Sequence, residues 1–167
     1  MIAVLSVSAG FFLGGKYLAF LQREKNLILE DALLMLNSVQ NRLRYSYAPL
    51  AEIMKSLAQS GCGSLTAFAE LCSTLLESGE AFPQAWSEGL SRKKEICRLF
   101  GNQKENFLML GKTLGTTDIE GQLSCCEYYK TVFEAEAKKR RETSERYSGV
   151  FPHLGALLGF AAAIFMI

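Results

Sequence analysis

The sequence predicts an all-α protein: an antiparallel helical bundle held between an N-terminal and a C-terminal transmembrane helix, which continue into the first and last helices of the bundle. All acidic residues, and all basic residues except Lys16, lie between residues 22 and 147. Each end has about the 20 residues that a helix needs to cross a bilayer, and Lys16 is the single charge in the two ends. In the middle, apolar residues recur at intervals of three and four, which is typical of helices. The predicted domains are a membrane helix (1–21), a cytoplasmic bundle (22–147) and a second membrane helix (148–167).

The two end segments are interpreted as retained membrane helices. No charge precedes the first apolar run, as a secretory signal peptide would require. Lys16 lies near the end of that run, where its ammonium group can reach the headgroups. Each segment has two glycines four residues apart, which allow a neighbouring helix backbone to come close. These predicted packing positions are Gly10 and Gly14, and Gly155 and Gly159.

The orientation follows from the basic residues beside the membrane segments. Arg23 and Lys25 follow the first segment, and residues 138–146 carry a basic run before the second. Because Lys and Arg accumulate on the cytoplasmic side, the middle is expected in the cytoplasm and both termini on the outer side.

The first helix of the middle is predicted to continue directly from the first membrane segment. Its apolar stripe consists of Leu29, Ala32, Leu36, Val39 and Leu43. No Gly or Pro interrupts it before Pro49, which disfavours helix in the preceding residue. We therefore expect the long helix to end near Tyr47 and a short helix to cover about residues 49–59, ending at the glycines of 61–63.

Local signals then predict three further helices. Ser64 is a candidate N-cap for a helix over residues 65–77, which Gly79 ends. A short helix is expected after Pro83, around Trp86 and Leu90. Asn102 and Glu105 resemble a capping arrangement for a helix that stops at Gly115.

The last helix is predicted to begin at a capping box formed by Thr117 and Glu120. Its inward residues at helical spacing are Ile119, Leu123, Cys126, Phe133 and Ala137. Residues 138–146 contain no apolar side chain, so these final turns are expected to leave the core and run into the second membrane segment.

The turn over residues 111–121 is the candidate partner-docking site. It reverses the chain at the end of the bundle expected to be farthest from the membrane. Three glycines and a capping box exceed what a reversal needs, although a purely structural turn remains an equal alternative. The candidate residues are Gly111, Lys112, Gly115, Thr117, Asp118, Glu120 and Gly121.

Several functional classes are disfavoured by composition. The charges of the middle balance, and no basic stripe is interleaved with aromatic residues, which excludes nucleic acid as a partner. The five cysteines are interpreted as reduced, buried thiols, and with a single histidine, His153, no metal or cofactor is predicted. Two alternatives to a non-enzymatic protein remain: a thiol redox site at Cys125 and Cys126, and a membrane-anchored sensor or adaptor.

Over its whole length the chain resembles the stage III sporulation protein AB family of endospore-forming bacteria. The residues that carry the resemblance are Pro49-Leu50, Ala85-Trp86, the stretches 110–115 and 134–137, and LGTTDIEGQL at 114–123. From about Leu65 the middle also looks like the F-domain of type II secretion and type IV pilus platform proteins, in which a leucine-rich helix ends in Ser-Gly, as residues 75–79 do. The chain departs from those proteins in having one copy of the domain, and in having Gly115-Thr116-Thr117-Asp118 in the stretch where they usually have a Gly-Glu pair.

The resemblance implies a platform in the secretion-like channel complex between mother cell and forespore. The implied location is the mother-cell membrane around the forespore. The implied partners are a secretion-type ATPase of the same complex and other membrane components of the channel, with a homo-oligomer as a further possibility.

Overall fold

The computed structural model describes the backbone of residues 2–148 and the side chains of residues 23–143. In this part of the chain every regular element is helical. The elements are α1 (Ile2–Ser46), α2 (Leu50–Ser60), η1 (Gly63–Leu65), α3 (Thr66–Glu77), α4 (Phe82–Arg92), α5 (Lys94–Phe100), η2 (Gly101–Gln103), α6 (Lys104–Leu114) and α7 (Ile119–Ser148). The predicted all-α class is confirmed.

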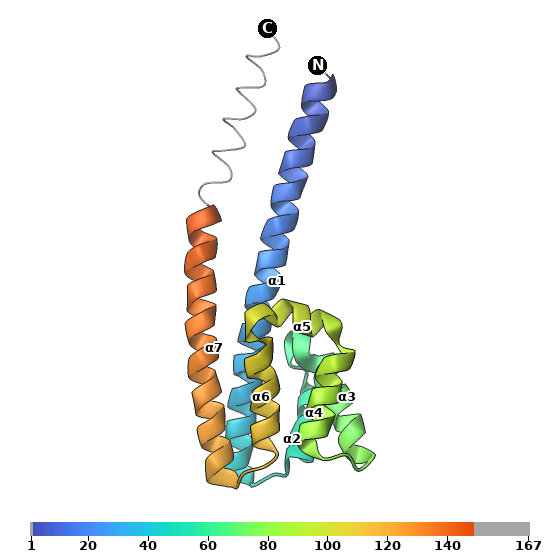
Figure 1. Cartoon of the computed structure of the whole chain (residues 1–167), viewed down its shortest axis with the longest axis vertical. Helices are drawn as coiled ribbons and strands as arrows, with labels where there is room; N and C mark the ends of the chain where they lie inside the picture. The colour runs from blue at the N-terminus through green and yellow to red at the C-terminus, as the bar shows by residue number, and fades with distance from the viewer. Residues whose placement is uncertain (1, 149–167) are drawn as a thin grey trace. The chain divides into compact units, whose positions relative to one another are not determined.

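The chain divides into two compact units. One unit is Leu27–Ala137, and the other combines Met1–Asn26 with Lys138–Ile167. Within Leu27–Ala137, α2 packs on α3, α3 on α4, and α4 on α6. The parts of α1 and α7 that belong to this unit lie side by side and run in opposite directions (Figure 1). This unit is the helical bundle that the sequence predicts.

Aromatic rings fill the centre of the bundle. The Trp86 ring lies 4.9 Å from Phe68 and 4.9 Å from Phe107, measured between ring centroids. Phe107 stacks on Phe100 at 4.3 Å, and Phe133 of α7 lies 6.1 Å from Phe100. The indole Nε1 of Trp86 donates a 2.9 Å hydrogen bond to the carbonyl of Phe107, which satisfies its buried polar atom. This cluster joins α3, α4, α5, α6 and α7.

The first helix follows the sequence prediction closely. Its stripe residues Leu29, Ala32, Leu36, Val39 and Leu43 are all buried, with exposures from 0% to 3%. The helix continues without a break from Ile2 to Ser46 and ends where Tyr47 adopts a φ of 50°. Pro49 is then the N-cap of α2, as its fixed φ favours.

The predicted cap at Ser64 is wrong. Residues Gly63–Leu65 form a short 3-10 helix, and α3 begins at Thr66. The Ser64 backbone N–H instead donates a 2.7 Å hydrogen bond to the Asp31 carboxylate of α1. Gly63 has a φ of +59°, and an added Cβ would lie 2.3 Å from Asp31 Oδ1. The loop that contains residues 61–63 therefore ends α2 and also contacts α1 at Asp31.

Helix α5 was not predicted, because its seven residues are too few to show a helical repeat. Ile96 and Phe100, four residues apart, are its buried residues. The predicted cap formed by Asn102 and Glu105 is wrong, since residues Gly101–Gln103 form a 3-10 turn and α6 starts after Gln103. The predicted end of this helix at Gly115 is confirmed.

The two predicted membrane segments fall mostly outside the described side chains. Residues 1–21 have a described helical backbone from Ile2 onward, and of 148–167 only Ser148 has a described backbone. Among the residues searched, no helix is both long and apolar enough to span a bilayer. Within the unit that contains these ends, Arg140 donates a 2.6 Å hydrogen bond to the Lys25 carbonyl.

Candidate docking surface

The start of α7 is fixed by Asp118 rather than by the predicted capping box. Asp118 Oδ1 accepts a 2.9 Å hydrogen bond from the Gly121 backbone N–H, three residues into the turn. Thr117 Oγ1 instead lies 3.4 Å from the Thr113 carbonyl, at the end of α6. Glu120 occupies the second helical position, one residue too early to complete a capping box. The prediction failed because Thr117 and Asp118 are both good N-cap residues. The path of the backbone determines which of the two caps the helix.

The glycines of the predicted docking turn make close contacts within the bundle. Gly111 is buried inside α6, where an added Cβ would lie 2.0 Å from Trp86 Cγ. At Gly115 the corresponding atom would lie 2.7 Å from Pro83 Cδ, and at Gly121 it would lie 2.9 Å from Asp118 Oδ1. Close packing against Trp86 and Pro83 thus accounts for Gly111 and Gly115, whereas the atoms nearest to Gly121 belong to the two residues that precede α7. The loop itself is short, covering residues 115–118 between α6 and α7.

A partly buried polar contact sets the register of α1 against α7 near this loop. The Gln40 side chain is 6% exposed. Its Nε2 donates hydrogen bonds to Glu127 Oε2 at 3.0 Å and to the Leu123 carbonyl at 3.4 Å. The Gln40 hydrogen bond, followed by the nearby Lys130 charge, lowers the pKa of Glu127. Because each buried donor needs an acceptor, a shift of either helix would leave the Gln40 amide unpaired.

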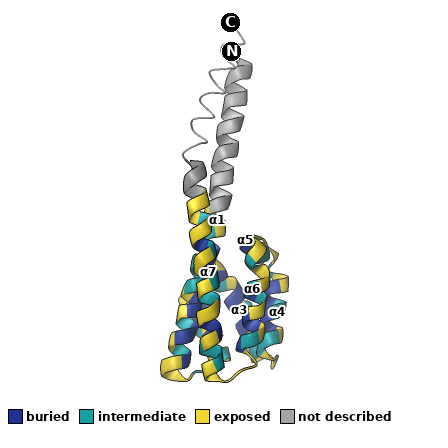
Figure 2. Cartoon of the chain, turned by 60° about the vertical axis from the view of Figure 1, so that its left-hand side comes forward, coloured by how far each residue is buried: buried dark blue, intermediate teal, exposed yellow. Residues whose placement is uncertain are grey.

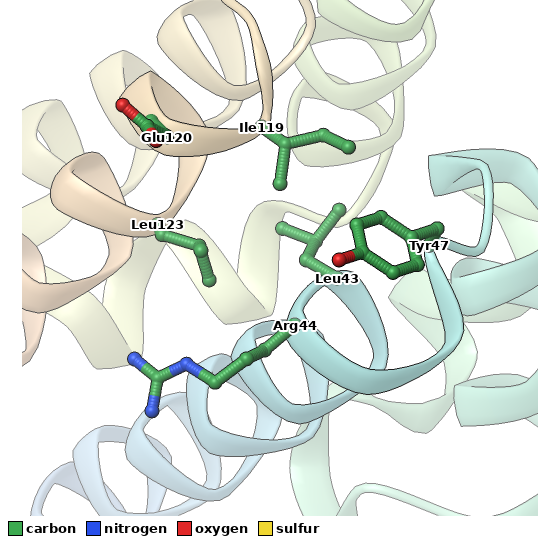
Figure 3. A pocket seen from close by; sticks show the side chains of 6 residues that line it. All are labelled: Leu43, Arg44, Tyr47, Ile119, Glu120 and Leu123. Carbon is green, nitrogen blue, oxygen red and sulfur yellow. The ribbon is translucent and has the colours of Figure 1, made fainter.

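One turn beyond this contact, α1 and α7 enclose a shallow groove of about 320 Å³. Figure 3 shows the side chains of Leu43, Tyr47, Ile119 and Leu123 facing one another across it. The charged groups of Arg44 and Glu120 point away from this apolar centre (Figure 3). We call these six residues the docking groove. Its apolar floor and charged rim are the usual composition of a protein-binding surface.

Two residues of the docking groove have unusual exposure or backbone geometry. Tyr47 is 72% exposed and has a positive φ, which a non-glycine residue adopts uncommonly. Ile119, predicted to face the core, is 38% exposed because it begins α7 at the end of the bundle. Tyr45, two residues before Tyr47 in the sequence, is 75% exposed. Residues 115–120, in the loop between α6 and α7 and at the start of α7, are all exposed (Figure 2). Large exposed apolar residues gathered at one place indicate a binding surface.

The structure places part of the predicted docking site at this groove. Lys112, Thr117, Asp118 and Glu120 are exposed, and Glu120 lines the groove itself. Gly111 is inaccessible to a partner because it is buried under Trp86. The α1 side of the groove was missed, although Tyr45 and Tyr47, directly after the last core leucine, were an available signal. Gly10, Gly14, Gly155 and Gly159 lie outside the described side chains, and their packing role stays a prediction.

The two thiols considered for redox chemistry have raised pKa values. Burial raises the pKa of Cys126 to about 12 and also raises the pKa of Cys125. A reactive thiol needs the opposite shift, toward the thiolate. All five cysteines are free. Within the described part of the chain, no three His, Cys, Asp or Glu side chains are grouped so that they could hold a metal ion.

Comparison with known proteins identifies the family of the chain. The family model described as Stage III sporulation protein AB (spore_III_AB) matches residues 1–167. No curated protein and no solved structure matches the chain.

Proposed function

Because the chain belongs to the stage III sporulation protein AB family, and so has a role in stage III of sporulation, we propose that it is a non-enzymatic membrane platform. In this proposal it is a component of the secretion-like channel complex between mother cell and forespore. Its bundle lies in the cytoplasm, and its two ends are anchored in the mother-cell membrane around the forespore. It binds a secretion-type ATPase of the same complex and other membrane components of the channel.

Membrane attachment is supported by the charge distribution of the sequence. The two ends, whose single charge is Lys16, have the length of membrane helices, and basic residues flank them on the side of the bundle. Helix α1 extends from residue 2 into the bundle without a break. The likeness of the middle to secretion platform domains supports the same arrangement.

The observation that carries the proposed docking role is the docking groove. It combines apolar side chains left exposed, a strained aromatic residue and charges of both signs at one end of the bundle. Strained residues persist where the surrounding structure holds them, and they gather at functional sites. We propose that the ATPase docks at this groove and at the neighbouring exposed side chains of Lys112 and Thr117.

The proposed orientation predicts the activity of inserted reporters. A reporter that is active only outside the cytoplasm should be active when fused after Ile167 and silent when inserted after Gly79. Gly79 suits an insertion because an added Cβ there would have no heavy atom within 4 Å. The measurement is reporter activity per amount of fusion protein in sporulating cells. The reverse pattern would place the bundle outside the cytoplasm and remove the proposed ATPase contact.

The docking proposal predicts that Tyr47→Asn weakens ATPase binding while the bundle stays folded. Asparagine tolerates a positive φ, so the backbone needs no change. Because Tyr47 is 72% exposed, the free energy of unfolding should change by about 0.5 kcal/mol or less. Loss of an aromatic contact at an interface typically costs 1 kcal/mol or more, so affinity should fall at least about fivefold. Calorimetric titration with purified ATPase measures this, and spore counts measure the effect in cells.

A second variant tests the charged rim, with a matched control. Lys112→Glu combined with Glu120→Lys reverses two exposed charges and spares the Asp118 cap. The control, Lys55→Glu with Glu77→Lys, exchanges an exposed ion pair on α2 and α3, and it should bind normally because surface pairs contribute little to stability. Equal binding by both variants and by Tyr47→Asn, at normal protein levels, would exclude this end of the bundle as the docking surface.

A further inference from the structure

The end of the bundle that carries the docking groove is acidic. Three connections meet there: residues 47–52 lead from α1 into α2, residues 77–82 from α3 into α4, and residues 115–120 from α6 into α7 (Figure 1). Together these segments contain five acidic side chains and no basic side chain. We call the three segments the acidic end. Its acidic residues are Glu52, Glu77, Glu80, Asp118 and Glu120.

Contacts between the three segments place their charges on one end of the bundle. The first and third segments both line the docking groove. The third also lies against the second, since an added Cβ at Gly115 would lie 3.0 Å from Phe82 Cβ. The second is tied to α2 by Glu77, whose carboxylate lies 2.8 Å from the Lys55 ammonium group. The carboxylates and the apolar groove therefore belong to the same surface region.

Most of these carboxylates have no cationic partner within the described residues. Glu77 is the one that forms an ion pair, with Lys55. Of the other four acidic residues, Glu80 is half-buried and three are exposed. Acidic residues still outnumber basic ones by five to three when the adjacent helical turn of every segment is included. No three acidic side chains of the described chain are grouped so that they could hold a metal ion, so the charge is spread over a surface.

The opposite end of the bundle carries the opposite charge. Residues 60–66, between α2 and α3, have no charged side chain, and residues 92–104, from the end of α4 to the start of α6, have five basic and one acidic. These segments meet at a hollow lined by Ser64 and residues 92–96. The 11 residues of α4 separate the two ends by about 16 Å. This is about two Debye lengths at physiological salt, so a partner at the acidic end experiences mainly a negative potential.

We propose that the ATPase surface that docks at the acidic end is basic, with Lys and Arg side chains around an apolar anchor that enters the docking groove; this rests on the proposed docking of the ATPase at that groove. Complementary charge raises the association rate and disfavours partners of like charge. The basic end repels the same surface, so the polarity of the bundle selects the orientation of the encounter. The apolar groove then supplies the short-range contacts that slow dissociation.

The test is the association rate constant of the purified ATPase with the full-length chain in uncharged detergent micelles. Glu52→Lys with Glu80→Lys reverses two charges of the acidic end and changes no residue of the docking groove. Association should slow about tenfold or more, because attraction becomes repulsion, while the dissociation rate constant should change little. Raising the salt from about 0.1 M to about 1 M shortens the Debye length from about 10 Å to about 3 Å. The parent chain should then associate nearly as slowly as the variant.

The matched control makes the same change at the other end of the bundle. Glu95→Lys with Glu105→Lys also replaces two glutamates by lysine, so the net charge of the chain changes equally. Both residues lie in the first turn of a helix, as Glu52 does. Association of the control should stay within about twofold of the parent rate, because these positions lie beyond the screening distance. If circular dichroism shows that the first variant is unfolded, Glu52→Gln with Glu80→Gln replaces it and should slow association in the same direction.

The other outcomes overturn the proposal, each for a different reason. If Tyr47→Asn weakens binding but the acidic-end variant associates as fast as the parent, the ATPase docks at the groove through a surface that is not basic. Faster association of the acidic-end variant would mean an acidic docking surface. Equal slowing by the control would mean a response to net charge alone. If neither Tyr47→Asn nor the acidic-end variant affects binding, docking at the groove is itself refuted.

Discussion

Replacing Phe133 by alanine is expected to lower the free energy of unfolding of the bundle by about 3–5 kcal/mol. Phe133 is fully buried, with its ring 6.4 Å from Phe107 and 6.2 Å from Tyr129. The smaller side chain loses the hydrophobic transfer energy and leaves a cavity that three surrounding helices cannot close. Chemical denaturation of a fragment of residues 26–147, followed by circular dichroism, measures the change.

The control for this experiment lies on the same helix. Tyr128 is 64% exposed, so Tyr128→Ala should change the free energy of unfolding by only about 0.5 kcal/mol. If Phe133→Ala cost no more than Tyr128→Ala, α7 would not be packed against the aromatic cluster. A fragment that failed to unfold cooperatively would refute the existence of an independent bundle.

Gly111→Ala is expected to destabilise the bundle by up to about 2 kcal/mol, because overpacking costs about 1–3 kcal/mol and the better helix propensity of alanine offsets about 1 kcal/mol. In an exposed helix this change adds about 1 kcal/mol of stability, so its sign here reports packing. The new Cβ would lie 2.0 Å from Trp86 Cγ. The indole cannot move away easily, because its Nε1 is hydrogen-bonded to the Phe107 carbonyl and its ring lies against Phe68.

An exposed position in α7 provides the comparison for Gly111. Ser124→Ala exchanges a weaker helix former for a stronger one at an exposed site and should stabilise slightly. The two variants are compared by thermal and chemical unfolding of the same fragment. A Gly111→Ala protein as stable as the parent would mean that Trp86 does not occupy this position, and close packing would no longer explain Gly111.

The candidate site was predicted only in part. The sequence located the loop between α6 and α7 and the exposed Glu120, but it did not identify the α1 side of the groove. Tyr47 is separated from Ile119 by most of the bundle sequence, and their approach depends on the register of α1 against α7. That register is set by Gln40, a polar residue at the edge of an apolar stripe, where a sequence pattern suggests a solvated side chain.

Local signals determined the helices of this protein except α5. The stripe from Leu29 to Leu43, the break at Pro49 and the stop at Gly115 act within one or two helical turns, so they can be read from neighbouring residues. The tertiary structure alone decided which residue caps α7, why Gly111 is a glycine and what fixes the Ser64 loop. These features depend on contacts with Trp86, Asp31 and other residues that are distant in the sequence. A glycine that close packing requires cannot be distinguished in the sequence from a glycine that a turn requires.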